Sequence, residues 1–312
     1  MTPLVWAGRH ASPLLLVGFV VVPFLPVEPD RLRPLLPSCV VLVTGLAFAR
    51  QRLDAANLRA LAAPKTVGLA ALWLAVSQVV IAVLAVSAGR AAGLDPATLL
   101  LIAAFFAAPP LGSAPNICLL LGYDFTLALR LTLVGTALAP VLTPLALAAS
   151  GVDSTTGDVA VRVLGMLAGG VLLGATIQLA AGPERIVRNG DALNGLAALA
   201  MLAFLFPLLA GKTEAIAEAP TRTLALLALA LILNMGGHLI VRMVATAAMP
   251  GPSARTTGYI FGNRNIAVVL ASVPFDPTLT LFVALMQAPI YATPALFSFL
   301  DRPRPCPRSS ES

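Results

Sequence analysis

The sequence predicts an all-α, polytopic membrane protein with ten transmembrane helices, and three observations support this fold class. Hydrophobic residues make up 58% of the 312 residues, and the mean hydropathy is +0.92. Charged residues make up only 11%, whereas a soluble domain carries about 25%. The apolar residues recur in separate runs that charged or proline-containing links divide. Runs of roughly 20 apolar residues match the thickness of a bilayer.

Ten runs of this kind follow one another along the chain. Their approximate bounds are 12–27, 35–49, 66–88, 97–121, 126–149, 159–181, 191–210, 222–248, 252–272 and 277–299. The first two are short, and the first follows Arg9 and His10, as the apolar region of a signal peptide would. No small-x-small cleavage pattern follows this run, and its removal would leave an odd number of spans. We therefore expect it to be a membrane span.

The links between the expected spans form two sets, one on each side of the membrane. Lysine and arginine residues are unevenly shared between these sets. Of the twenty, twelve fall on the side of both termini and two lie inside expected spans. The six on the opposite side are Arg31, Arg33, Arg90, Arg162, Lys212 and Arg222. Cytoplasmic flanks of membrane helices are enriched in cations, so this bias predicts cytoplasmic termini in a multi-pass protein of the cell (inner or plasma) membrane. The tail 301–312 is rich in proline, arginine and serine and is expected to be disordered and cytoplasmic.

The same composition argues against several function classes. The formal net charge is +6, but the cations are dispersed and form no patch with interleaved aromatic residues, so nucleic acid is not an expected partner. His10 and His238 are the only histidines, and neither joins a metal-binding motif or a pair of carboxylates. We therefore expect no enzyme and no metal cofactor. The expected partners are the lipid bilayer and a small substrate, and the oligomeric state stays open.

Equivalent motifs recur at an offset of 149 residues, which indicates an internal repeat. Asn116 in the fourth span maps onto Asn265 in the ninth, and the fifth and tenth spans share an Ala-Pro pair followed by a Thr-Pro pair. The expected repeats are 1–149 and 150–300. Because each unit has five helices, the second copy would be inverted relative to the first, as in many secondary transporters.

The fourth span contains the run Pro-Pro-Leu-Gly-Ser-Ala-Pro-Asn, from Pro109 to Asn116. Its three prolines remove backbone donors, and Gly112 permits unusual dihedral angles, so this segment is expected to break the helix. The released backbone groups need a cavity, a ligand or surrounding protein at membrane depth. In transporters, half-helix ends of this kind present free amides to a substrate or an ion. A proline-kinked packing helix is the alternative.

The ninth span carries Gly262-Asn263-Arg264-Asn265 at the corresponding place. An arginine at the centre of a span costs about 2.5–3.5 kcal/mol on insertion scales, so it is expected to face a cavity or a partner. Two roles are open for Arg264. It can bind an anionic substrate, or it can hold main-chain carbonyl groups of the broken fourth span.

These segments resemble the bile acid:sodium symporter family. The matching motifs are Pro110-x-Gly112-x-x-x-Asn116, Gly122-x-Asp124, Leu131-Thr132 through Pro140-x-x-Thr143-Pro144, Gly262-x-x-Asn265 and Asn234-x-Gly236. Together they cover roughly residues 105–148 and 230–272. The resemblance implies a panel domain from spans 1, 2, 6 and 7 and a core domain from spans 3–5 and 8–10. The broken spans 4 and 9 would cross, and substrate would bind where the domains and this crossing meet.

The resemblance also implies a sodium site, which this chain retains only in part. The family's sodium ligands fall on Gln78, Asn116 and Thr132. Its serine ligand is Pro115 here, while Ile260 replaces an acidic residue and Arg264 replaces a glutamine. In addition, all fourteen acidic residues lie in links, tails or span edges. We therefore infer that the guanidinium replaces a coupling cation and that sodium coupling is altered or lost.

The sequence thus favours a secondary transporter that moves a small organic anion by alternating access. The residues expected to bind the substrate are Arg264, Asn265, Asn263, Asn116, Ser113 and Asn234. Those expected to serve a coupling sodium ion or proton are Gln78, Asn116, Thr132 and His238, of which His238 has packing as its alternative role. Two other functions stay open. One is an efflux carrier of similar fold for metalloid anions or auxin, which Cys118 near the crossing favours, and the other is a membrane sensor that does not transport.

Overall fold

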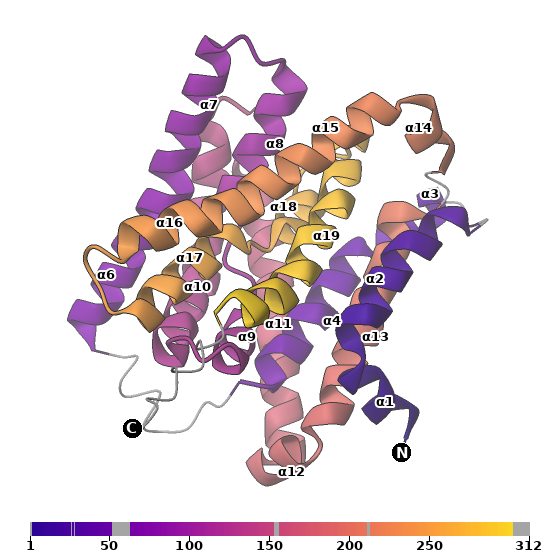
Figure 1. Cartoon of the computed structure of the whole chain (residues 1–312), viewed down its shortest axis with the longest axis vertical. Helices are drawn as coiled ribbons and strands as arrows, with labels where there is room; N and C mark the ends of the chain where they lie inside the picture. Colours follow the sequence, from indigo (N-terminus) through magenta and orange to yellow (C-terminus); the bar gives the residue numbers. More distant parts are fainter. Residues whose placement is uncertain are drawn as a thin grey trace, which may run out of the picture.

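The computed structural model describes residues 2–25, 27, 29–51, 63–152, 156–210 and 213–301. Within these residues the chain is helical and forms no β-strand (Figure 1), as expected. The helices in chain order are α1 (Pro3–Arg9), α2 (Ala11–Val21), η1 (Val22–Phe24), α3 (Pro29–Leu32), η2 (Arg33–Leu35), α4 (Leu36–Ala49), α6 (Pro64–Ala75), η3 (Val76–Val80), α7 (Ile81–Ala91), α8 (Pro96–Ala107), α9 (Ala114–Leu120), α10 (Phe125–Ala149), α11 (Thr156–Ala181), α12 (Pro183–Arg188), α13 (Gly190–Leu209), α14 (Thr213–Glu218), α15 (Pro220–Leu231), η4 (Ile232–Gly236), α16 (Gly237–Ala245), α17 (Gly251–Gly262), α18 (Ile266–Ser272) and α19 (Pro277–Leu300). The segments η1 and η2 are 3-10 helices, whereas η3 and η4 are π-helices.

Six continuous helical stretches are long and apolar enough to cross a membrane, which agrees with a multi-pass membrane protein. They are Pro64–Ala91, Phe125–Ala149, Thr156–Ala181, Gly190–Leu209, Pro220–Ala245 and Pro277–Leu300. The number becomes seven if Pro3–Arg9 and Ala11–Phe24 form one span, although this pair is bent by 88°. By length and composition, the described residues therefore contain fewer membrane-spanning helices than the ten that the sequence predicts.

The remaining expected spans are short or divided. The second corresponds to the short apolar helix Arg33–Ala49, and the fourth begins with another, Pro96–Ala107. The chain breaks between α8 and α9 and again between α17 and α18, so the fourth and ninth expected spans are not single helices. The structure also adds α1 before the first expected span, and the chain turns sharply into α2 at His10.

The order of elements in the first part of the chain recurs in the second. A long helix with an internal π-helix, η3 or η4, comes before a divided pair of helices, α8 and α9 or α17 and α18. A long helix with two internal prolines then follows, α10 or α19. An aspartate begins each of these two helices, because the side chains of Asp124 and Asp276 accept hydrogen bonds from the amides of Leu127 and Leu279.

The helices pack in two groups. The first helix group is α1, α2, α4, α11 and α13, and the second helix group is α6 to α10 with α15 to α19. Figure 1 shows α2, α4 and α13 on one side of α19 and α10, α16 and α17 on the other. The groups meet where α10 and α18 contact α11, and where α18 and α19 contact α2, α4 and α13. A shared core of buried residues, which includes Phe105, Leu205 and Phe282, joins them.

Candidate functional site

The two chain breaks pair with each other, and we call them the paired breaks. Pro110, between α8 and α9, and Arg264, between α17 and α18, form an isolated antiparallel bridge. The amide of Asn265 donates to the carbonyl of Pro109 at 2.8 Å, and the amide of Leu111 donates to the carbonyl of Asn263 at 3.1 Å. Each break thus satisfies backbone groups of the other, which removes part of the cost of broken helices at membrane depth.

Arg264 is 2% exposed, and its guanidinium binds main-chain oxygens. Nε donates to the carbonyl of Phe261 at 3.0 Å, and Nη1 donates to those of Phe106 and Ala108 at 3.2 and 3.1 Å. Nη2 donates to the carbonyl of Ser77 at 3.2 Å. One N–H group remains, which is too few for a bidentate grip on an anion. The geometry thus matches the second role considered for Arg264, that of holding carbonyl groups around the breaks.

Asn263 and Asn234 form a buried network beside the paired breaks. Nδ2 of Asn234 donates to the carbonyl of Gly262 at 2.8 Å and to Oδ1 of Asn263 at 3.3 Å. The hydroxyl of Thr293 in α19 donates to Oδ1 of Asn234 at 3.0 Å, and Nδ2 of Asn263 donates to the carbonyl of Tyr259 at 3.0 Å. Both amide side chains are fully buried, and neither lines the cavity described next. Their partners are protein groups, so these two residues position the second break.

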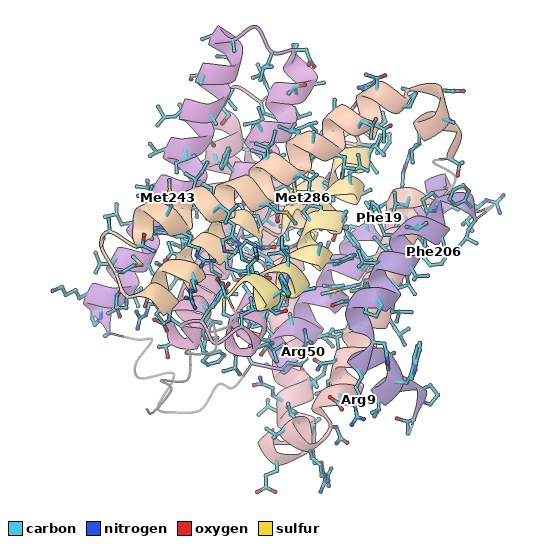
Figure 2. The ribbon with its side chains drawn as sticks, viewed as in Figure 1. Arg9, Phe19, Arg50, Phe206, Met243 and Met286 are labelled. Carbon is cyan, nitrogen blue, oxygen red and sulfur yellow. The ribbon has the colours of Figure 1, made fainter. Side chains whose placement is uncertain are left out.

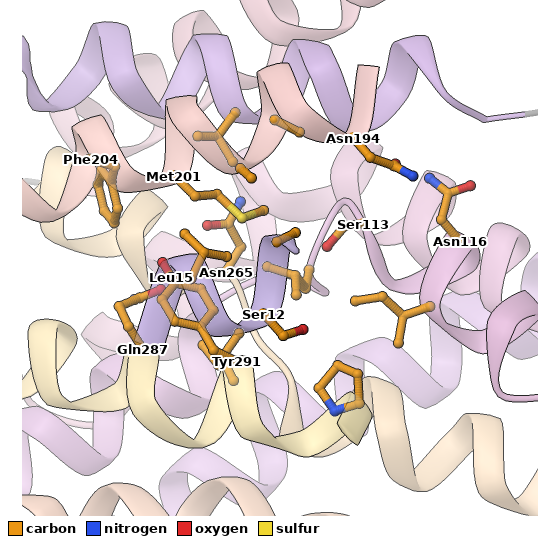
Figure 3. A pocket seen from close by; sticks show the side chains of 18 of the residues that line it. Ser12, Leu15, Ser113, Asn116, Asn194, Met201, Phe204, Asn265, Gln287 and Tyr291 are labelled. Atoms are coloured by element: carbon orange, nitrogen blue, oxygen red, sulfur yellow. The ribbon is translucent and has the colours of Figure 1, made fainter. Parts of the chain in front are cut away.

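A cavity of about 340 Å³ lies between the two helix groups, next to the paired breaks. Residues of α1, α2, α4 and α13 line one side, and residues of α9, α18 and α19 line the other. Figure 3 shows Leu15, Phe204 and Tyr291 toward one end and Asn116 and Asn194 toward the opposite end. Small-molecule sites have volumes of about 300–1,000 Å³. The cavity is therefore large enough for a small substrate, and it has an apolar end and a polar end.

Four of the predicted substrate-binding residues, Ser113, Asn116, Arg264 and Asn265, line this cavity. Ser113 is 5% exposed, and its hydroxyl has no hydrogen-bond partner among the described residues. Nδ2 of Asn116 likewise has no partner in that part of the chain. A buried polar group without a partner costs about 1–3 kcal/mol, so both groups are suited to bind a ligand or water.

Arg50 and Asn194, which the sequence did not single out, complete the polar end of the cavity. Arg50 follows α4, and its Nη1 donates to Oδ1 of Asn194 in α13 at 2.6 Å. Its Nε donates to the carbonyl of Leu46 at 3.2 Å. From the sequence Arg50 counts as a loop cation, because it ends an apolar run. Only the packing of α4 against α13 brings it to the cavity, and no local pattern indicates that packing.

The cavity lining carries positive charge. Arg9, Arg50 and Arg264 line it, whereas no aspartate or glutamate of the described chain does. Arg9 pairs with Asp191 at 2.8 Å in an exposed position, and Arg264 is held by carbonyl groups. Figure 2 shows Arg9 and Arg50 toward the same end of the molecule. A partly buried cation without a counter-ion favours an anion beside it, so the electrostatics fit an anionic ligand.

The predicted ion-coupling residues Gln78, Thr132 and His238 do not line the cavity. All three are fully buried. The amide of Gln78 and the hydroxyl of Thr132 have no hydrogen-bond partner among the described residues. His238 stacks on Phe297 with 4.0 Å between ring centroids, and neither of its ring nitrogens has a hydrogen-bond partner among the described residues.

Gln51 connects α4 to the first break. Its Nε2 donates to the carbonyl of Gly112 at 3.0 Å. The main-chain carbonyl of Gln51 accepts a hydrogen bond from Nε2 of Gln178 in α11 at 2.9 Å. Gln51 is 3% exposed, so this link between the two helix groups is shielded from solvent.

Asp301, which the sequence places in the tail, closes α19 and is bound to α16. Its carboxylate accepts hydrogen bonds from Nη2 and Nη1 of Arg242 at 2.7 and 3.1 Å, and the hydroxyl of Tyr123 donates to it as well. Burial raises the pKa of the Asp301 carboxyl, but the hydrogen bonds from Arg242 and Tyr123 and the charges of Arg242 and Arg255 outweigh it, so the pKa lies below its usual value. Residues 302–312, where disorder is expected, lie outside the described chain.

No family model matches the chain, and no curated protein matches it in sequence either. Its function is therefore inferred from the site itself.

Proposed function

We propose that the protein is a secondary transporter that moves a small organic anion across the cell membrane by alternating access. The observation that carries this proposal is the cavity beside the paired breaks, whose lining holds arginine and amide groups but no described carboxylate. Broken helices next to a binding cavity are typical of secondary transporters. The sequence resemblance to bile acid:sodium symporters favours the same mechanism.

The proposal includes a ten-span plan with inverted repeats over 1–149 and 150–300. The recurring order of π-helix, divided helix and proline-containing helix supports the repeat. A unit of five spans would place the second copy upside down relative to the first. The first helix group would then act as the panel domain and the second helix group as the core domain. Rocking of one against the other would open the cavity to either side of the membrane in turn.

The contacts around the cavity suit such a rigid-body motion. The bonds from Arg264 to Ser77, Phe106 and Ala108 all lie within the second helix group, so they can persist while the groups move. The bond from Gln51 to Gly112 joins the two groups and has to break when they separate. A carrier needs firm contacts inside each moving body, and the bonds of Arg264 supply such contacts within the second helix group.

We further propose that coupling to sodium is altered or lost. The guanidinium of Arg264 already places a fixed positive charge among four carbonyl oxygens beside the cavity. A cation bound next to it would be repelled, because no described carboxylate lines the site. The organic anion would therefore move without a sodium ion, and its charge would be balanced by the arginine groups of the protein.

Counterflow in proteoliposomes tests the transport function. Vesicles with the purified protein are loaded with one unlabelled carboxylate or sulfonated organic anion and diluted into a trace of the same labelled anion. We expect transient accumulation of label that protein-free vesicles do not show. Absence of exchange for every anion, by a protein that elutes as one folded species, would contradict transport and favour a sensor.

Reporter fusions test the proposed orientation. The cation bias of the links predicts that both termini are cytoplasmic. Green fluorescent protein at the C-terminus should therefore be bright, and alkaline phosphatase at the same position should be inactive. Active phosphatase there would overturn the orientation and the inverted repeat with it.

A further inference from the structure

We infer that Arg50, oriented by Asn194, binds the anionic group of the substrate, and that the substrate is a monoanion with a short apolar body. This inference rests on the proposed transport function and names the binding residue and the substrate class for the same cavity. It differs from the expectation for Arg264, whose guanidinium donates to main-chain carbonyl groups.

Two hydrogen bonds fix the guanidinium of Arg50. Oδ1 of Asn194 accepts from Nη1 at 2.6 Å, and the carbonyl of Leu46 accepts from Nε at 3.2 Å. Neither partner is charged, and within the described chain no acceptor is bonded to Nη2. A guanidinium that is held in place loses little side-chain entropy when it binds, which favours tight recognition. Arg50 is therefore an oriented cation with donor capacity left for a ligand.

Two neutral groups at the same end of the cavity can assist Arg50. The hydroxyl of Ser113 and Nδ2 of Asn116 line the cavity, and neither has a hydrogen-bond partner among the described residues. In Figure 3 the amide groups of Asn194 and Asn116 point toward one another across the polar end. A carboxylate or sulfonate has several acceptor oxygens and so can receive hydrogen bonds from Arg50, Ser113 and Asn116 together.

The other arginines of the lining have little donor capacity left for a ligand. Arg9 pairs with Asp191 at 2.8 Å, and four of the five N–H groups of Arg264 already donate to carbonyl groups. Arg50 and Arg264 both lack a charged partner in the described chain, but of the two only Arg50 has donors left for a bidentate contact. One anionic group can therefore bind Arg50, whereas a second one would lie in the cavity without such a contact, at a high desolvation cost.

The opposite end of the cavity selects an apolar body. Leu15, Phe204 and Tyr291 lie toward it, beside Gln287 (Figure 3), and Leu15 and Phe204 are 6% and 5% exposed. Burial of apolar ligand surface there favours binding, because it removes that surface from water. An inorganic anion would fill the polar end and leave this surface uncovered. The ligand that matches both ends therefore has one anionic head and an apolar chain or ring.

Binding to the purified protein in detergent separates this inference from transport. Labelled hexanoate serves as the probe, and unlabelled hexanesulfonate, hexanamide and adipate compete with it. We expect hexanesulfonate to compete about as well as hexanoate. Hexanamide lacks the charge and adipate carries a second one at its apolar end, so both should compete at least about tenfold more weakly. Equal competition by hexanamide, or no saturable binding of hexanoate, would overturn the assigned substrate class.

Variants of Arg50 test the residue assignment. Arg50→Gln should weaken hexanoate binding by roughly 30-fold or more, because it removes the charge partner. Arg50→Lys should retain part of the affinity, since lysine keeps the charge but loses the fork that binds Asn194. Arg188→Gln, an exposed arginine of α12, is the charge-matched control and should bind as the wild type does.

The outcomes distinguish the two proposals. If Arg50→Gln does not fold, the affinity of Arg50→Lys for hexanoate tests the role of Arg50. Unchanged affinity in either folded variant overturns that role, even where counterflow succeeds. If hexanoate binds with the expected dependence on Arg50 but no anion exchanges across vesicles, the binding site stands and the transport function fails.

Discussion

Pro110 and Arg264 lie opposite each other where two broken helices pair. The backbone of their neighbours makes the two hydrogen bonds of the bridge, and the side chain of Arg264 binds the carbonyl groups around the end of α8. Proline has no amide hydrogen, so α8 cannot continue through Pro109 and Pro110. The side chain of Arg264 and the main chain of its two neighbours thus compensate for a helix that proline has interrupted.

Arg264→Ala should therefore lower stability as well as transport. Four buried carbonyl groups would lose their donor, and hydrogen bonds to charged groups contribute about 1.5–3 kcal/mol each, so a loss of several kcal/mol is expected. Thermal unfolding of the protein in detergent measures it. Arg188→Ala, an exposed arginine in α12, should leave the melting temperature unchanged. If Arg264→Ala melts like the wild type, the carbonyl groups do not depend on the guanidinium.

Gly262→Ala should loosen the packing of α17 against η4. A Cβ at Gly262 would lie 2.3 Å from the carbonyl oxygen of Asn234, a main-chain atom that cannot rotate away. Such overpacking costs about 1–3 kcal/mol, and the Asn234–Asn263 contact would be displaced. Unfolding temperature and counterflow rate should both fall. The control is Gly68→Ala, where no atom lies within 4 Å of the new Cβ, and a drop of equal size there would contradict this explanation.

Transport should proceed at the same rate when choline replaces sodium, because Arg264 supplies the positive charge beside the cavity. Counterflow of one anion in the two media, with equal ionic strength, measures this. A strict need for sodium would show that the guanidinium does not replace the ion. The amide of Gln78 and the hydroxyl of Thr132, both buried without described partners, would then be the first groups to substitute.

Asp301→Asn should destabilise the protein at neutral pH by about 1–2 kcal/mol, because Arg242 loses its charged partner. The folded pKa of Asp301 lies below its usual value, so the stabilisation is present above the unfolded value of about 3.9 and is lost as the pH falls from there through the folded pKa. The difference between the melting temperatures of the two proteins should therefore shrink as the pH falls below about 3.9. A difference in melting temperature that does not change with pH would show that the ion pair is not its cause.

The breaks in the helices could be predicted from the sequence because their causes are local. Pro109, Pro110 and Pro115 remove amides within one short segment, and Gly262 ends α17 next to polar residues. The number of membrane spans is harder to predict from the sequence. Length and composition identify continuous apolar helices, whereas the pieces on either side of a break, and the bent α1 and α2, are too short to be counted alone.

The role of each arginine could not be read from its position in the sequence. The sequence leaves two roles open for Arg264, and its hydrogen bonds to the carbonyl groups of Ser77 and Phe106 favour the role of holding the breaks. Arg50 and Asn194 are 144 residues apart, and their contact depends on how α4 packs against α13. The sequence predicts one arginine at the site, and the structure brings Arg9 and Arg50 to the same cavity.

Each of the π-helices η3 and η4 accommodates an extra residue inside a long helix. Ser77 in η3 and Asn234 in η4 both contact the segment around the second break, through the bonds to Arg264 and Gly262. A π turn holds one residue more than an α turn, so deleting one residue from η3 would let that turn close to a regular α-helix and keep the two ends of the long helix in register. The carbonyl of Ser77 would then be withdrawn from Arg264. A single-residue deletion at η3 or η4 is therefore expected to preserve the long helix and to remove its contact with the second break.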